Sequence, residues 1–253
     1  MALAPTVLVV AGSDSSGGAG VARDLSTLFR HGVRAALAVT AVTAQTHAAV
    51  RAVETMPAAL VVEQMLAALG ASPVGAVKIG MLGSGQTAMA VAGVLGDYPA
   101  CPAILDPVLS ASAGGSLLAG DTRTALDGLM ARATLVTPNR PELARLCGEP
   151  EATSHDEAIA QAVRLLGRGA RAVLVKGGHA GGARSDDLLV MPGAAVQRFS
   201  SPRLPFTLRG TGCTLASAIA ARLALGAGLS EAIALAKQHV SERLAEEGLP
   251  SDR

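Results

Sequence analysis

The chain has 253 residues, of which 50% are apolar and 16% are charged, and its formal net charge is +1. A chain of this length can form one α/β domain with a large core. The near-neutral charge and the aromatic content of 2% argue against nucleic acid as a partner, because nucleic-acid binding relies on basic clusters and stacking rings. No eighteen consecutive residues are apolar, so we expect no membrane segment. This composition favours a protein that binds small molecules.

The cysteine pattern and the N-terminal residues indicate the cellular compartment. Cys101, Cys147 and Cys213 are odd in number, far apart and without Cys-x-x-Cys spacing, so they predict neither a disulfide framework nor a zinc site. The residues before the first apolar run do not have the pattern of a secretory signal. We therefore expect a cytoplasmic protein.

Short apolar runs alternate with longer helical patterns along most of the sequence. Strands are predicted at 6–11, 35–42, 75–79, 102–106, 133–137 and 171–176. Helices are predicted at 19–31, 58–69, 86–95, 121–132, 154–168, 211–225 and 229–247. This alternation is typical of parallel strands joined by crossover helices. Two strand-like runs near 188–199 predict an antiparallel pair at one edge. We expect a single α/β domain over residues 1–253, with a mostly parallel sheet between two helical layers.

Polar or glycine-rich segments follow the predicted strands. In open α/β sheets, ligands bind beyond the carboxyl ends of the strands. These segments are therefore predicted to form one active-site rim, here called the rim. They are residues 12–20, 43–45, 78–81, 106–108, 137–142, 176–179 and 209–214.

The first rim segment matches no familiar nucleotide-binding motif. Gly12 and Gly17 have P-loop spacing, but Gly18 stands where a P-loop has Lys, and Gly-x-Gly-x-x-Gly is absent. The segment is therefore interpreted as glycine-rich backbone that can approach a ligand closely. Asp24 falls one turn into the following helix, where it could also be an ordinary solvated carboxylate.

The last rim segment predicts an anion site. Gly210, Thr211 and Gly212 precede an Ala-rich helix, whose first N–H groups and dipole favour a phosphate. Cys213 lies in the same positive field, which is expected to lower the pKa of its thiol. Alternatively, Cys213 is an inert buried cysteine beside a glycine-lined turn.

Four further residues have the chemistry to handle a magnesium-bound nucleotide. Asp106 and Lys176 each end an apolar strand, and Asn139 and Glu142 are spaced to share one face of a helical turn. The carboxylate of Asp106 is expected at the strand mouth and the ammonium of Lys176 could reach a nucleotide phosphate, or the two could form a strand-end ion pair. The other two could organise Mg²⁺ through water or form a helix capping box. The five His residues show no metal spacing, and His179 in the rim is interpreted as loop structure.

Taken together, the rim motifs resemble those of the hydroxymethylpyrimidine and phosphomethylpyrimidine kinases, a ribokinase-like family of thiamine biosynthesis. They occur in the family's order over nearly the whole chain. Most ribokinase-like enzymes carry Asp at the Cys213 position, so Cys213 is the most specific mark. The motifs are Ala11-Gly-Ser-Asp-Ser-Ser-Gly-Gly-Ala-Gly20, Thr43-Ala-Gln45, Lys78-Ile-Gly-Met-Leu82, Leu105-Asp-Pro-Val108, Thr137-Pro-Asn-x-x-Glu142, Val175-Lys-Gly-Gly-His179 and Gly210-Thr-Gly-Cys-Thr214.

The resemblance implies a ribokinase-like three-layer αβα fold, a homodimer, and MgATP-dependent phosphorylation of 4-amino-5-hydroxymethyl-2-methylpyrimidine and then of its monophosphate. It implies a catalytic set of Gly210, Thr211, Gly212 and Cys213. It implies a pyrimidine site of Gln45, Asp24, Gly12, Met81 and Val108. For MgATP it implies Asp106, Asn139, Glu142 and Lys176, with Mg²⁺ held through Asp106 and Glu142. The carboxamide of Gln45 suits an aminopyrimidine edge, as it suits adenine in DNA.

The sequence departs from the family pattern in three places, and two other functions stay open. The loop 109–115 lacks the Lys often found there, Arg209 replaces the usual His, and the chain ends without the glycine-rich tail of many relatives. Arg209 could add charge for a phosphate or be solvated. The alternatives are a pyridoxal kinase and a non-catalytic relative that binds the pyrimidine.

Overall fold

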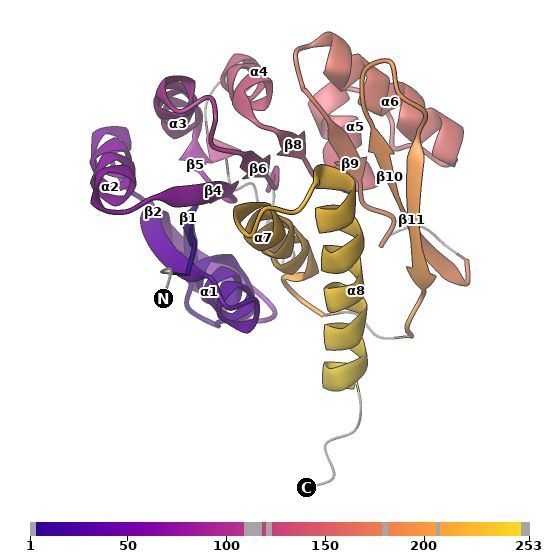
Figure 1. Ribbon diagram of the computed structural model, residues 1–253, viewed down its shortest axis with the longest axis horizontal. Coiled ribbons are helices and arrows are strands. Elements are labelled where there is room, and N and C mark those ends of the chain that lie inside the picture. The colour runs from indigo at the N-terminus through magenta and orange to yellow at the C-terminus, as the bar shows by residue number, and fades with distance from the viewer. Residues whose placement is uncertain (1–3, 109–117, 120–122, 179–181, 206–207, 249–253) are drawn as a thin grey trace, which may run out of the picture.

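The computed structural model describes residues 4–108, 118–119, 123–178, 182–205 and 208–248. Its main sheet has nine strands in the order β11-β10-β9-β8-β6-β4-β1-β2-β3 (Figure 1). Their bounds are β1 Thr6–Asp14, β2 Arg34–Gln45, β3 Val50–Thr55, β4 Val74–Ile79, β6 Ala103–Leu105, β8 Leu135–Val136, β9 Val173–Val175, β10 Arg184–Val190 and β11 Gln197–Pro202. The helices are α1 Gly20–Arg30, α2 Ala58–Ala71, α3 Gly85–Asp97, α4 Arg123–Arg132, α5 Arg140–Cys147, α6 His155–Gly167, α7 Thr211–Ala224 and α8 Leu229–Gly248.

The sheet is mostly parallel, as the sequence predicts. Strands β2, β1, β4, β6, β8 and β9 pair in parallel. The predicted antiparallel pair is present as β10 and β11 at one edge. The other edge is β3, which pairs antiparallel with β2. This strand was not predicted, because it has only six residues and they are largely exposed. Strands β5 (Gly83–Ser84) and β7 (Leu118–Ala119) form a separate two-stranded parallel sheet.

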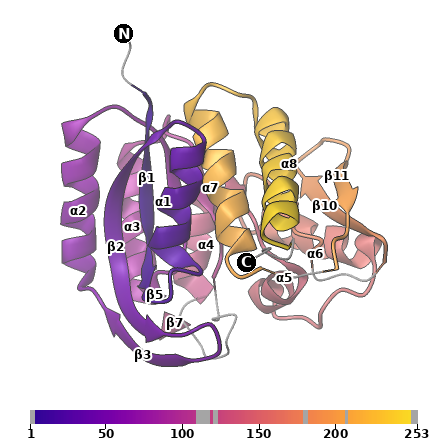
Figure 2. The same cartoon turned by 90° about the horizontal axis from the view of Figure 1, so that it is seen from below.

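Helices cover both faces of the sheet. Alternate residues of β1 enter different cores: Val7 and Val9 pack in the core with α1, α7 and α8, whereas Leu8 and Val10 pack in the core with α2 to α6. Figure 2 shows α1, α7 and α8 side by side on one face of the sheet. This period of two is the geometry of a strand buried on both faces.

Small residues let α7 lie close to the middle of the sheet. A Cβ added at Gly75 in β4 would lie 3.0 Å from the Cβ of Ala224 in α7. The helix packs against β4, β6, α1 and α8, and every residue from Thr214 to Ala221 is buried. Because a helix buried on all sides has no room for long side chains, the Ala-rich sequence fits this place. Its first residue, Thr211, lies in the rim segment 209–214, so α7 runs from the rim along the sheet.

Among the described residues, no helix has both the length and the apolar character needed to cross a membrane.

Candidate functional site

The residues predicted to bind the magnesium-bound nucleotide lie together in the rim. Nζ of Lys176 is 2.7 Å from Oδ1 of Asp106 and 3.5 Å from Oε2 of Glu142. Asn139 and Lys176 also form a parallel bridge between the ends of β8 and β9. The sequence could not decide between a structural and a functional reading of these residues, and the ion pair and the capping box that it considered are both present.

Electrostatic coupling keeps Lys176 charged. Burial by itself disfavours the ammonium, but Asp106 and Glu142 hold the pKa of Lys176 above its usual range. Burial also raises the pKa of Glu142, against the opposing effect of Lys176 and of the Asn139 backbone N–H. One ammonium therefore stabilises two carboxylates, and a group that displaces it must satisfy both of them.

The glycine turn before α7 adjoins this charged cluster. Gly210 has φ +77°, and a Cβ there would lie 2.4 Å from the carbonyl oxygen of Gly18, so only glycine fits. A Cβ at Gly212 would lie 3.1 Å from Nζ of Lys176. The first turn of α7, which starts at Thr211, therefore lies beside Lys176, and a helix start of this kind has N–H groups without a partner in the helix.

Cys213 lies at the same helix start, but the expected lowering of its pKa is wrong. Burial raises the pKa of the Cys213 thiol to about 11; Lys78 opposes this rise, whereas Asp24 and Asp106 add to it. The N–H of Gly20 donates to Sγ and also opposes the rise. Desolvation outweighs the field of the helix, so Cys213 is a neutral thiol at pH 7 in this structure.

Asp24 is neither a solvated carboxylate nor exposed on the rim. It is 0% exposed, and its two oxygens accept from Nζ of Lys78 at 2.8 Å and from Oγ of Ser217 at 2.8 Å. The pairing also keeps Lys78 charged, since Asp24 raises the pKa of Lys78 although burial lowers it. The resemblance placed Asp24 around the substrate, whereas its carboxylate lies beneath the rim and is held by two other elements.

Lys78 is the buried residue that the sequence reasoning did not assign. It is 0% exposed inside β4, and a Cβ at Gly80 would lie 2.9 Å from its Nζ. A lysine within an apolar run of a central parallel strand requires a buried counter-charge. That signal was present in the segment 74–79, although the partner could not be identified from the sequence.

Two of the residues predicted to surround the pyrimidine, Met81 and Val108, are part of an apolar wall. Met81, Val108 and Ala41 pack together, apart from the two main cores. A Cβ at Gly12 would lie 2.9 Å from Sδ of Met81, so the glycine lets this wall approach β1. Gln45 ends β2 beside the first rim segment, where its backbone N–H donates to Oγ of Ser15 at 2.8 Å.

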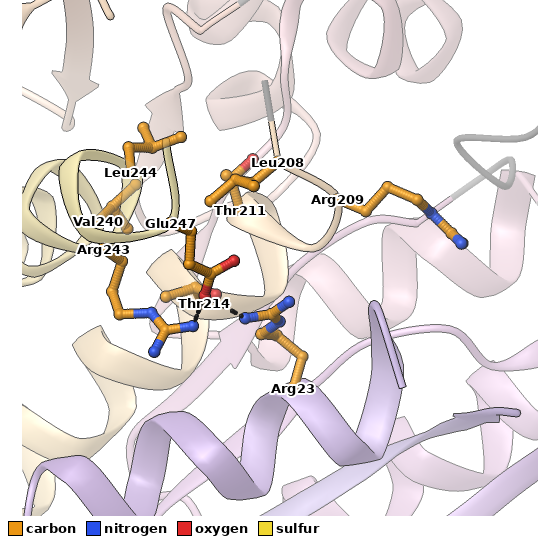
Figure 3. Close-up of a pocket in the computed structure, with 9 residues that line it drawn as sticks. All are labelled: Arg23, Leu208, Arg209, Thr211, Thr214, Val240, Arg243, Leu244 and Glu247. Atoms are coloured by element: carbon orange, nitrogen blue, oxygen red, sulfur yellow. Dashed lines mark hydrogen bonds and ion pairs between the residues drawn. The ribbon is translucent and has the colours of Figure 1, made fainter. Parts of the chain in front are cut away.

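Arg209 reaches into this part of the rim and is not solvated. Its guanidinium donates to Oε1 of Gln45 at 3.2 Å and to the carbonyl oxygen of Thr46 at 3.0 Å. Figure 3 shows it directed away from the neighbouring pocket, in which Arg23 and Arg243 both pair with Glu247. The guanidinium of Arg209 therefore belongs to the rim, although the residue also lines that pocket.

Three of the residues or segments discussed from the sequence lie outside the described residues. They are the loop 109–115, His179 and the last residues of the chain.

Comparison with known proteins identifies the family. The family model described as phosphomethylpyrimidine kinase matches residues 14–251. The chain belongs to this family. The hydroxymethylpyrimidine/phosphomethylpyrimidine kinase of Rhizobium meliloti is 42% identical over 235 residues, which are 92% of this chain and 88% of that protein.

Other relatives are longer. A thiamine biosynthesis multifunctional protein of Corynebacterium efficiens is 42% identical over 95% of this chain, but this region is only 33% of that protein. For a bifunctional thiamine biosynthesis protein of Geobacter sulfurreducens, the identity is 44% and the shares are 93% and 48%. The chain thus spans a third to a half of the length of these relatives.

Solved structures support the ribokinase-like fold. The phosphomethylpyrimidine kinase of Clostridium difficile has a TM-score of 0.81 at 33% identity and covers 96% of this chain and 100% of its own. An ADP complex of Bacillus subtilis pyridoxal kinase has a TM-score of 0.84 at 29% identity, with coverage of 93% and 90%. The fold is therefore that of small-molecule kinases, as the sequence predicts.

Proposed function

We propose that residues 1–253 act as a single kinase domain that transfers the γ-phosphoryl group of ATP to 4-amino-5-hydroxymethyl-2-methylpyrimidine and then to its monophosphate. One observation carries this proposal: the glycine turn 210–212 lies directly against the Lys176–Asp106 ion pair, 3.1 Å from Nζ to a Cβ at Gly212. A preorganised anion pocket beside a fixed cation suits a transferring phosphoryl group. The names of the relatives support the pyrimidine as the acceptor.

In the first transfer the substrate hydroxyl oxygen attacks the γ-phosphorus, the bond from the γ-phosphorus to the β–γ bridging oxygen breaks, and ADP leaves; in the second transfer a phosphate oxygen of the monophosphate attacks in the same way. The N–H groups of Gly210, Thr211 and Gly212 donate to the oxygens of the migrating phosphoryl group. Cys213 accepts the hydroxyl proton when it is a thiolate. Gln45 binds the pyrimidine edge, while Gly12, Met81 and Val108 hold its faces.

Asp24 would act indirectly. Its carboxylate is tied to Lys78 and Ser217, so its proposed role is to hold Lys78 charged beneath Cys213. The nearby ammonium favours the thiolate, and this effect is larger than that of the Asp24 charge itself, which disfavours the thiolate.

Asp106 and Glu142 fit the Mg²⁺ that accompanies ATP. Both are carboxylates that already surround one cation, Lys176, and Asn139 fixes Glu142 through the capping box. The described residues contain no group of three or more His, Cys, Asp or Glu that could enclose a metal. The pair of carboxylates suits Mg²⁺, which is held through one or two carboxylates together with phosphate and water. The ion would neutralise phosphate charge.

The nucleoside end of ATP has a candidate groove between β11 and α8. It is lined by Phe199, Ser200, Ser201, Pro202, Ala234, Lys237, Gln238 and Ser241. Nζ of Lys237 is 2.8 Å from Oδ2 of Asp187, and Oδ1 of Asp187 accepts from the N–H of Gly177 at 2.7 Å. These contacts link Lys237 of the groove, through Asp187, to the backbone next to Lys176, which supports placing the nucleoside end of ATP on this side of the rim.

A second candidate substrate is pyridoxal. It is favoured by the similarity to pyridoxal kinases, among them one from Staphylococcus aureus solved with pyridoxal, at 29% identity and a TM-score of 0.83. Pyridoxal is also a hydroxymethyl heteroaromatic, so the same transfer could act on it. A third possibility is a relative that binds the pyrimidine without turnover.

We also propose a homodimer in the cytoplasm. The edge formed by β2 and β3 exposes the apolar side chains of Leu37, Val42 and Val53, and an exposed edge strand with apolar side chains favours pairing. Val53→Lys should convert a dimer to a monomer in light scattering coupled to gel filtration. A wild-type protein that elutes as a monomer at micromolar concentration would contradict the dimer.

One assay tests the function. The protein is incubated with MgATP and, in parallel, with the free pyrimidine, its monophosphate and pyridoxal, and the products are separated by chromatography. We expect transfer to the pyrimidine and its monophosphate, and slower transfer to pyridoxal. Faster turnover of pyridoxal would favour the second candidate. Binding of the pyrimidine without transfer to any acceptor would favour the non-catalytic alternative.

A further inference from the structure

Arg209 connects three separate parts of the rim. It precedes the glycine turn at the start of α7, and its guanidinium lies against the first rim segment and the end of β2. Its NH1 donates to Oγ of Ser16 at 3.3 Å, and its NH2 lies 3.5 Å from Oδ2 of Asp14. The side chains of Arg209 and Asp14 are only 18% and 2% exposed. The guanidinium is therefore anchored in place.

This anchor determines how the carboxamide of Gln45 is turned. A guanidinium has only N–H donors, so the Gln45 atom that faces it must be the oxygen. The observed contact is NH2 of Arg209 to Oε1 of Gln45 at 3.2 Å. Ser15 holds the backbone of Gln45 at the same time, with its Oγ 2.8 Å from the backbone N–H. Both the chain and the side-chain amide of Gln45 are thus oriented before any ligand arrives.

The orientation leaves a specific pair of groups for a ligand. Oε1 of Gln45 keeps a second lone pair, and within the described residues its amide N–H groups have no hydrogen-bond partner. A ligand edge that complements this pair must present a donor beside an acceptor. A 4-aminopyrimidine does so with its exocyclic amine and its adjacent ring nitrogen. Pyridoxal has a methyl group beside its ring nitrogen and offers no such donor.

We propose that Arg209 is a specificity-determining positioning residue, which fixes the donor–acceptor order of Gln45 and thereby selects an aminopyrimidine edge. The inference rests on the proposed function. An unanchored amide can rotate by 180°, so that in part of the protein molecules the Gln45 oxygen and nitrogen exchange places and no longer match the aminopyrimidine. Loss of the anchor should therefore weaken aminopyrimidine recognition and have little effect on chemistry at the glycine turn or on the nucleotide.

The test compares Arg209→Met, Gln45→Ala and the double variant in steady-state kinetics and in calorimetric binding of 4-amino-5-hydroxymethyl-2-methylpyrimidine. Arg209→Met should raise the pyrimidine KM and Kd by about tenfold, the order expected for one charge-assisted hydrogen bond. The kcat, the ATP KM and the pyridoxal KM should change by less than about threefold. In the Gln45→Ala background, the same substitution should have almost no further effect, because it acts through Gln45.

Two controls keep the result specific. Arg30→Met, at an ion pair with Glu246 in which Arg30 is 46% exposed, removes an arginine far from the rim and should match wild type. Arg209→Lys keeps a cation that can only donate, but not the planar fork, so its pyrimidine KM should lie between those of wild type and Arg209→Met. A pyrimidine KM in Arg209→Lys above that of Arg209→Met would contradict the proposal.

Other outcomes separate this inference from the proposed function. Additive effects of Arg209→Met and Gln45→Ala, or equal losses for the pyrimidine and pyridoxal, would show that Arg209 does not act through Gln45. If wild type binds and phosphorylates the pyrimidine and Arg209→Met does so equally well, only this inference fails. If wild type neither binds nor phosphorylates the pyrimidine, both fail.

Discussion

Nζ of Lys176 lies 2.7 Å from Oδ1 of Asp106, and the two side chains are 12% and 3% exposed. They come from the ends of β9 and β6, which are 70 residues apart in sequence. A buried pair of this kind costs desolvation energy that a pair of apolar residues would not. Its position beside the glycine turn explains why the proposed kinase would keep it: Lys176 can exchange a carboxylate for a phosphate.

Replacing Lys176 should therefore affect stability and catalysis separately. Lys176→Met leaves Asp106 and Glu142 without their shared cation, so we expect a lower free energy of unfolding, an increased ATP KM and a kcat reduced on the order of 10²-fold. Asp106→Asn/Lys176→Met should recover much of the stability and none of the activity. Urea unfolding and steady-state kinetics measure the two effects. An active double variant would reduce the ion pair to a structural role.

Gly212 provides a test of the phosphate position. An Ala side chain at position 212 would lie 3.1 Å from Nζ of Lys176 and 3.4 Å from Oδ2 of Asp106, where the proposed phosphoryl group passes. Since the tightest contact of the added Cβ is with the end of the flexible Lys176 side chain, Gly212→Ala should fold about as well as wild type. Its kcat should fall on the order of 10²-fold, because the methyl group fills the anion pocket.

Gly93→Ala is the matched control for this substitution. Gly93 lies inside α3 with nothing within 4 Å of an added Cβ. It should gain stability and keep full activity. A Gly212→Ala variant with the activity of Gly93→Ala would place the phosphoryl group elsewhere.

The stability of the protein should fall at mildly acidic pH because of His31. Burial lowers the pKa of His31 to about 4, and the nearby His239 and Arg222 add to this effect; the two His rings are 4.6 Å apart. The unfolded chain binds the proton more readily, so stability is present above pH 6.5 and is lost as the pH falls toward 4. After allowance for partial exposure, we expect about 1–2 kcal/mol.

His31→Phe removes this proton and should make the dependence shallower. Urea midpoints at pH 8 and pH 4.5 measure it, and the difference between the two midpoints should be smaller in the variant than in wild type. Equal differences in both proteins would assign the acid sensitivity to other groups.

Much of the fold and of the rim follows from local patterns in the sequence. Apolar runs such as 6–11 and 75–79 predict buried parallel strands, and the segments that follow them were correctly expected at one edge of the sheet. The edge strand β3 was missed because Val50–Thr55 has little burial to produce an apolar pattern. Of helix α5 only the first turn was predicted, from the capping box of Asn139 and Glu142, because the helix is only eight residues long.

The energetics of the site could not be predicted from the sequence in the same way. Asp24 and Lys78 are 54 residues apart, so their contact is a property of the tertiary structure. Arg209 and Gln45 are 164 residues apart. The direction of the pKa shift of Cys213 depends on how much water the surrounding protein removes, and the local signal of a helix start gave the wrong sign.

Cys213 offers the sharpest test of the proposed chemistry, because its pKa of about 11 restricts how it can act. At pH 7 the thiolate fraction is on the order of 10⁻⁴. As long as the pH stays below the pKa, this fraction increases tenfold for each unit by which the pH is raised. If the thiolate accepts the hydroxyl proton, wild-type kcat should increase with a slope near one between pH 7 and 9. Cys213→Ala should lose activity on the order of 10²-fold and should lose this slope.

Cys101→Ala is the control for the loss of a thiol elsewhere. Its cysteine is partly buried, with Sγ in contact with the carbonyl oxygen of Val74, and the variant should keep both the activity and the slope. A flat wild-type profile, or a Cys213→Ala kcat within a few fold of wild type, would leave the glycine turn as the sole catalytic group at this end of α7.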